Sequence, residues 1–133
     1  MFSKKNAKRL LPIQSLVGVD MVLRGDLRFK GGLRIDGEVD GNVIADDSAQ
    51  SLLVISETGK VRGSVRVGHV VVSGLIEGPI EANQLLELHP SANVSGDVRY
   101  RALEMHPGAI VDGTLHHESE EVVPGKLALA SSK

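Results

Sequence analysis

One five-residue pattern recurs six times along the chain, and this repeat constrains the fold more than any other feature of the sequence. The pattern runs apolar, polar, glycine, any residue, apolar, and its first copy is Leu23-Arg24-Gly25-Asp26-Leu27. The copies are centred on Gly25, Gly41, Gly63, Gly78, Gly96 and Gly113. Their steps of 16, 22, 15, 18 and 17 residues indicate one repeated structural unit.

A short strand signal, apolar at its first and third positions, precedes five of the six motifs. These signals occupy residues 33–35, 53–55, 70–72, 86–88 and 103–105. The last two repeats also share a His-Pro turn, at His89-Pro90 and His106-Pro107. The long step of 22 comes from extra residues at 46–51, which we predict to form a surface loop.

The repeat predicts an all-β fold, a parallel β-solenoid of about six coils with about three short strands in each. A unit of this length is too short for a strand, a crossover helix and two loops. Both apolar residues of the motif point to one side of an extended segment, and the glycine between them lets the chain bend or another backbone approach. Aromatic residues make up only 2% of the chain, so Val, Leu and Ile must build the core.

In-register stacking also predicts a ladder of charges on the surface. The residue before the glycine is Arg24, Asp40, Arg62 and Glu77 in the first four coils, so the sign alternates at every step. Opposite charges on adjacent strands contribute about 0.2–1 kcal/mol per pair. The same stacking makes Glu87 and Glu104 like-charged neighbours, a cost that the pattern does not explain.

The two ends of such a solenoid expose unpaired backbone groups and an apolar cross-section. The sequence offers no amphipathic helix to cap either end, so we expect end-to-end association. The expected polymer interface consists of Leu16, Val17, Val19, Val22 and Leu23 at one end and Met105, Ile110, Val111 and Leu115 at the other. The alternative is that residues 10–13 fold over one end and seal it.

The first residues of the chain form a basic head. Lys4, Lys5, Lys8 and Arg9 precede the first acidic residue, and Met1 and Phe2 add apolar bulk at the tip. Basic residues near an anionic leaflet contribute about 1 kcal/mol each. We therefore predict that these six residues bind a membrane, although the charge run alone is equally typical of a solvated tail.

Several classes of chemistry are not indicated. The formal net charge of −2 and the scarcity of aromatic residues argue against a nucleic-acid partner. There are no cysteines, no P-loop pattern and no convincing nucleophile–base set, so we expect neither a cofactor nor an enzyme. No apolar run is long enough to span a membrane and no signal peptide is evident, which favours the cytoplasm.

The histidines suggest stacking rather than catalysis. His89 and His106 occupy equivalent places one coil apart, and His116-His117 follows near the end. Metal sites need three or four convergent ligands, so no metal site is predicted here. Histidine pairs could nevertheless make assembly sensitive to pH, since they titrate between about pH 5 and 8.

Taken together, these motifs resemble the bactofilin family of bacterial cytoskeletal proteins. The resemblance covers residues 15–117 and depends on the repeated glycine motifs, such as those in 34–43 and 70–74, and on the Phe2-Ser3-Lys4-Lys5 start. It divides the chain into a disordered membrane-binding head at 1–14, a β-helix domain at 15–117 and a disordered tail at 118–133. Some members have Phe in the last coil, where this chain has aliphatic residues.

The resemblance implies more than the repeat does by itself. It implies a single-stranded, right-handed β-helix that polymerises without nucleotide into non-polar filaments, joining like ends. It also implies attachment to the inner face of the cytoplasmic membrane, where the filaments scaffold client proteins such as cell-wall enzymes.

Two other functions remain open on the residues alone. One is a monomeric β-helix adaptor that binds a partner on its flat faces. The other is a hexapeptide-repeat acyltransferase, but those enzymes need a strict six-residue period, and steps of 16, 22, 15 and 17 do not fit it.

Overall fold

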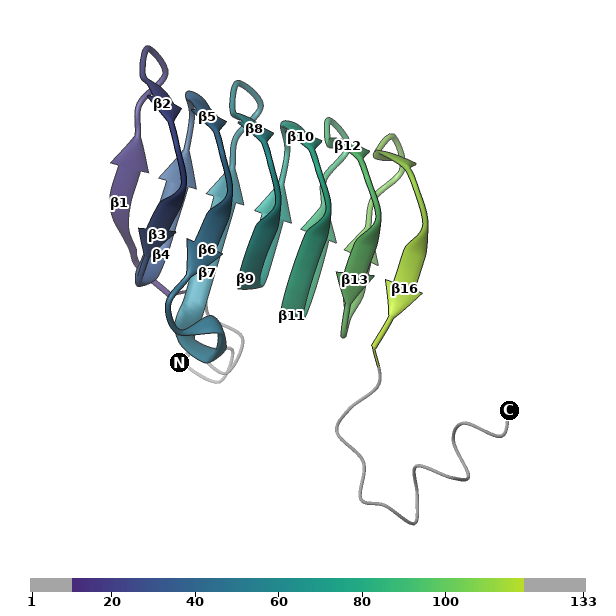
Figure 1. Ribbon diagram of the computed structural model, residues 1–133. Helices are drawn as coiled ribbons and strands as arrows, with labels where there is room; N and C mark the ends of the chain where they lie inside the picture. The colour runs from purple at the N-terminus through teal and green to yellow at the C-terminus, as the bar shows by residue number, and fades with distance from the viewer. Residues whose placement is uncertain (1–10, 119–133) are drawn as a thin grey trace, which may run out of the picture.

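The chain folds as a stack of six coils, each built from three short parallel strands (Figure 1). The computed structural model describes residues 11–118. Within that range the protein is all-β, and its one helical segment is a single 3-10 turn. The predicted parallel β-solenoid of about six coils is confirmed. The first strand begins at Ile13, two residues before the expected start of the domain.

Each coil passes over three faces in the same order. The first face is a six-stranded sheet of β2 (Val22–Arg24), β5 (Glu38–Asp40), β8 (Lys60–Arg62), β10 (Leu75–Glu77), β12 (Asn93–Ser95) and β15 (Ile110–Asp112). The second face contains β3 (Leu27–Phe29), β6 (Val43–Ala45), the first halves of β9 (Val65–Val72) and β11 (Ile80–Leu88), β13 (Val98–Tyr100) and β16 (Leu115–His117). The third contains β1 (Ile13–Val17), β4 (Gly31–Ile35), β7 (Ser51–Ile55), the second halves of β9 and β11, and β14 (Leu103–Met105). The coils are counted from this third face, so the first coil consists of β1, β2 and β3 and the last of β14, β15 and β16.

The core is a set of aliphatic columns that run the length of the stack. On the first face, Val39, Val61, Ile76 and Val94 pair in successive coils, and all four are fully buried. On this face the middle residue of each strand points inward, whereas on the other two faces the middle residue points outward. The strands of the first face therefore differ in phase from those of the other two faces, that is, in which of their three residues point into the core.

The repeated glycines form the corner between the first and second faces. Gly41, Gly63 and Gly78 have φ angles of 156°, 155° and 153°. A Cβ on Gly63 would lie 2.2 Å from the carbonyl oxygen of Gly41, and the same clash recurs from coil to coil. The interpretation of the motif as one extended segment is therefore wrong, because its two apolar residues belong to different sheets. Glycine is required there because the preceding coil's backbone occupies the space of a side chain.

The residue after the glycine satisfies a backbone donor in the next coil. Asp26 accepts from the N–H of Asn42 at 3.1 Å, and Asn42 accepts from the N–H of Ser64 at 2.9 Å. The next position in this column is Pro79, which has no N–H to satisfy. Proline also has no side-chain acceptor, so the ladder skips two steps, and Asp97 resumes it by accepting from the N–H of Thr114 at 3.1 Å.

The predicted charge ladder is confirmed in register. Arg24 pairs with Asp40, Asp40 with Arg62, and Arg62 with Glu77 on successive strands of the first face. The closest nitrogen–oxygen distances are 3.9, 3.7 and 3.2 Å, and Arg62 also pairs with Glu38. These carboxylates raise the pKa of Arg62, with Glu38 contributing most.

Glu87 and Glu104 are neighbours, as predicted, and the structure supplies the compensation that the pattern lacked. Glu87 lies 3.0 Å from Nε2 of His69 and 3.2 Å from Nε2 of His89. Burial acts to raise the pKa of Glu87, but the hydrogen bonds and charges of the two histidines outweigh it, so this pKa lies below its ordinary value.

The extra residues of the long repeat form a 3-10 turn, η2 (Ser48–Gln50), with Asp47 as its N-cap. The carbonyl of Ala49 accepts a hydrogen bond from Gln84 at 3.1 Å. The predicted surface loop is thus held against the outside of later coils.

We expect Gly63→Ala to be more destabilising than Gly25→Ala. Gly25 has a φ of +125°, but no atom lies within 4 Å of the position that its Cβ would take. Alanine at position 25 should cost only backbone strain, about 1–3 kcal/mol. Alanine at position 63 adds overpacking of about 1–3 kcal/mol. Urea denaturation measures both, and equal losses would contradict the proposed clash between coils.

Candidate functional site at the two tips

Among residues 11–118, no strand follows the last coil to cover the aliphatic columns at the C-terminal tip. Leu103, Met105, Val111 and Leu115 continue columns whose members one coil earlier are fully buried. Met105 and Leu115 are 45% and 41% exposed, and Leu103 and Val111 are half-buried. Three of these four residues were predicted, and Leu103 was not. The last coil therefore presents an apolar cross-section.

The N-terminal tip is less open. Leu23 and Leu27 are half-buried, whereas Val17 is 4% and Phe29 8% exposed. Val17, predicted as an interface residue, thus belongs to the core of the chain itself. Phe29 occupies a column continued by Ala45 in the next coil, so a large side chain fills the space at this end.

Four other predicted interface residues lie beside the tips rather than on them. Leu16, Val22 and Ile110 occupy outward columns, because they pair with Arg34, Glu38 and Asn93. Val19 lies in the turn between β1 and β2. All four are exposed on the sides of the end coils, Leu16, Val19 and Val22 on the first and Ile110 on the last.

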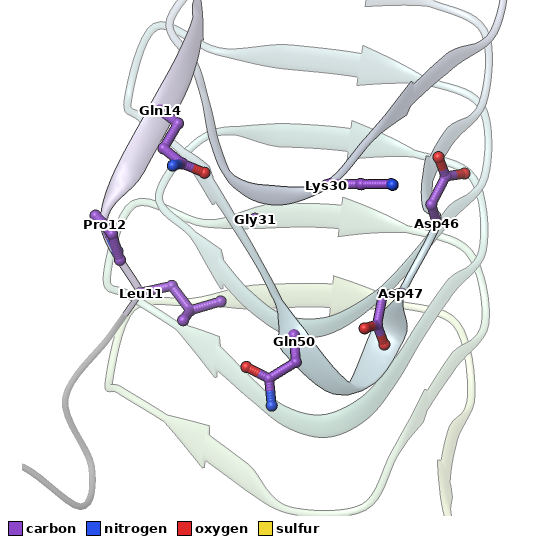
Figure 2. Close-up of a pocket in the computed structure, with 8 residues that line it drawn as sticks. All are labelled: Leu11, Pro12, Gln14, Lys30, Gly31, Asp46, Asp47 and Gln50. Atoms are coloured by element: carbon purple, nitrogen blue, oxygen red, sulfur yellow. The ribbon is translucent and has the colours of Figure 1, made fainter.

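The described part of residues 10–13 does not seal a tip. Leu11 and Pro12 line a cavity of about 680 Å³ together with Lys30, Asp47 and Gln50 (Figure 2). Ile13 pairs with Gly32 of the second coil. This segment therefore runs along the flank, at the corner between the second and third faces, and Leu10 lies outside the described residues.

The remaining predictions concern the basic head, a metal site and the histidines. The membrane-binding residues Met1, Phe2, Lys4, Lys5, Lys8 and Arg9 all lie outside the described residues. Between residues 11 and 118, no helix is long and apolar enough to cross a membrane, and no group of three or more acidic or histidine side chains could hold a metal ion. The expected contact of His89 with His106 is confirmed, and the two rings meet edge to face with centroids 5.0 Å apart.

Both tips are suited to adding further strands. Within each coil, backbone groups pair with the coil before and the coil after, as when Lys60 donates to Gly37 and Leu75 donates to Gly59. At the last coil this pairing has only one neighbour within the described chain. An edge of β-strands beside an apolar cross-section can be completed by the strands of another chain.

Comparison with known proteins agrees with this geometry. Residues 15–116 match the bactofilin family, described as polymer-forming cytoskeletal. The chain is 28% identical over 85 residues to bactofilin BacP of Myxococcus xanthus, covering 64% of this chain and 34% of BacP. It therefore spans about a third of the length of that relative.

Two solved structures share the fold. One is the bactofilin BacA determined by solid-state NMR, with 32% identity, a TM-score of 0.70 and coverage of 82% of this chain and 100% of that one. The other is the Thermus thermophilus bactofilin in double helical filaments, with 29% identity, a TM-score of 0.66 and coverage of 77% and 99%. The six-coil solenoid and the family match over most of its length lead to one conclusion: the chain belongs to the bactofilin family of cytoskeletal proteins.

Proposed function

We propose that this protein is a structural element that assembles end to end into filaments. The observation that carries the proposal is the exposed apolar cross-section of the last coil, where Met105 and Leu115 are 45% and 41% exposed. Burying apolar surface contributes about 25 cal/mol per Å², so these side chains favour contact with another tip. The double helical filaments of the Thermus thermophilus relative support assembly into a polymer.

The proposed filaments are non-polar and need no nucleotide. Like tips join like tips, so a two-fold axis relates neighbouring chains and the filament has no direction. Stacking of strands and burial of the tips supply the free energy, and no hydrolysis cycle is part of this assembly.

The proposed cellular role is a scaffold on the inner face of the cytoplasmic membrane. The basic head would contact anionic lipid, and many heads on one filament would multiply a weak attachment. The filament would then position client proteins, such as cell-wall enzymes, and would not itself be an enzyme.

Arginine at one tip should stop growth but leave dimers. Leu27 and Leu115 occupy the same column in the first and last coils. Because an arginine there buries a charge at the joint, we expect Leu27→Arg to leave dimers joined at the C-terminal tip, and Leu115→Arg to leave dimers joined at the N-terminal tip. The double variant should be monomeric. Analytical ultracentrifugation and negative-stain microscopy distinguish these species.

Asn93→Arg is the matched control, since Asn93 is exposed on the flank of the fifth coil and should leave filaments intact. Monomers from either single variant would indicate a head-to-tail filament. A wild-type protein that remains monomeric at high concentration would favour the adaptor function instead.

Deleting residues 2–9 should separate membrane binding from assembly. The deletion removes Lys4, Lys5, Lys8 and Arg9 and no residue of any described coil. We expect filaments of normal length that no longer co-sediment with liposomes containing phosphatidylserine. Replacing the four cations by glutamine in the full chain is the control for length, and retained liposome binding in both variants would refute the role of the head.

A further inference from the structure

The phase of the strands in the last coil limits how two C-terminal tips can meet. A two-fold axis across the stack brings the strands of two chains together antiparallel. On β15 the middle residue, Val111, continues an inward column. On β14 and β16 the middle residues Glu104 and His116 continue outward columns, which contain Glu87 and Arg99.

Only one orientation of that axis keeps inward residues opposite inward residues without shifting a strand. The axis must pass through the first face, so that β15 pairs with its own copy and β14 of each chain pairs with β16 of the other. An axis through either other face would place β15 on β14 or β16, and would set inward Val111 against outward Glu104 or His116.

The permitted orientation brings together one apolar and one oppositely charged type of pair, and it also sets Leu103 opposite His117 and Ile110 opposite Asp112. It places Met105 opposite Leu115 on the inside and Glu104 opposite His116 on the outside, and the two-fold axis repeats both pairs. The columns behind them have the same signs: Glu104 follows Glu87, and His116 follows Arg99. The Glu104 side of each chain therefore meets the His116 side of its partner.

A head-to-tail joint would also bring apolar columns together, Val111 beside Leu23 and Leu115 beside Leu27, but it makes different contacts at Glu104 and His116. Continuing the register would place Asp112 beside Arg24, which is favourable, but would also place His116 beside Arg28 and Glu104 beside Leu16. The two joints thus differ in what faces Glu104 and His116.

We propose that two copies of this chain join at their C-terminal tips through reciprocal Glu104–His116 pairs, and that protonation of His116 tightens this joint. The proposal rests on the end-to-end assembly proposed above, and adds the register and the pH dependence of one joint. Histidine gains its proton between about pH 8 and 5. The attraction is therefore present on the acid side of this range and lost as the pH rises.

The other charged groups near the pair are already partnered within the chain. Nη1 of Arg99, the residue that precedes His116 in the same column, lies 2.8 Å from Oε2 of Glu118. Glu87, which neighbours Glu104, is held by His69 and His89, and His89 packs against His106. His117 points inward beside Tyr100 and interacts with the carbonyl oxygen of Arg101 at 3.0 Å. Both Glu104 and His116 are exposed on the outer surface of the last coil, where a second chain can reach them.

Disulfide cross-linking tests the register. The chain contains no cysteine, so every cross-link comes from an introduced residue. The double variant Glu104→Cys/His116→Cys should form a covalent dimer under mild oxidation, whereas each single variant should not, because each residue faces the other type. The control Glu87→Cys/Arg99→Cys places the same pair one coil deeper in each chain. Its cysteines would be about 14 Å apart, beyond the reach of a disulfide.

The pH dependence is measured on dimers joined only at this tip, in the Leu27→Arg background. Two reciprocal pairs should lower the dissociation constant by about two- to thirty-fold between pH 8 and pH 6. His116→Gln should abolish this change, and His106→Gln should preserve it. In the same background, Glu104→Lys should weaken the dimer at pH 6, and adding His116→Glu should restore it, a rescue that does not depend on cysteines.

The outcomes distinguish the joint from the assembly as a whole. Dimers that form in the Leu27→Arg background without a cross-link in the double variant, or with equal cross-linking in the single variants, would overturn the register while leaving end-to-end assembly in place. A pH dependence that survives His116→Gln would overturn the role of protonation. A wild-type chain that never assembles would remove the proposed function and this joint together.

Discussion

The structure depends on stacking each coil directly on the one before, at the separation of a single β-sheet ladder. At the corner between the first and second faces this leaves no room for a side chain. A Cβ on Gly96 would lie 2.5 Å from the carbonyl oxygen of Gly78, and one on Gly113 would lie 2.1 Å from that of Gly96. Glycine at each corner keeps the coils in register, and the register in turn decides which residues become neighbours on the surface.

That register turns local sequence into long-range order. One position per coil becomes a column, and the members of a column share one kind of contact, such as core packing at Val61, charge pairing at Arg62 and backbone capping at Asn42. The columns also explain why the ends are the reactive parts of the molecule. In the middle of the stack each member of a column contacts a residue of the coil before and one of the coil after, whereas in the last coil it contacts only the coil before, as at Leu115.

Much of the fold could be predicted from the repeat. Six glycine motifs predict six coils. Stacking of those coils predicts the alternation of charge from Arg24 to Glu77 and the contact of His89 with His106. Handedness came from the family resemblance and not from the pattern. The sequence allowed either a bend or a close backbone approach at the glycine, and the structure has both, but an apolar pair four residues apart fits a straight strand as well as a corner. Whether an apolar side chain points in or out depends on the phase of its strand, which differs between faces, so Leu16 and Ile110 could not be placed from their character alone.

The alternating ladder on the first face also restricts how such a rod can change in length. Arg24, Asp40, Arg62 and Glu77 repeat their sign every second coil. Duplicating a single coil within that stretch would set two arginines or two carboxylates on adjacent strands, whereas duplicating two coils would preserve every attraction. Gene duplication would therefore extend this part of the molecule most readily by an even number of turns.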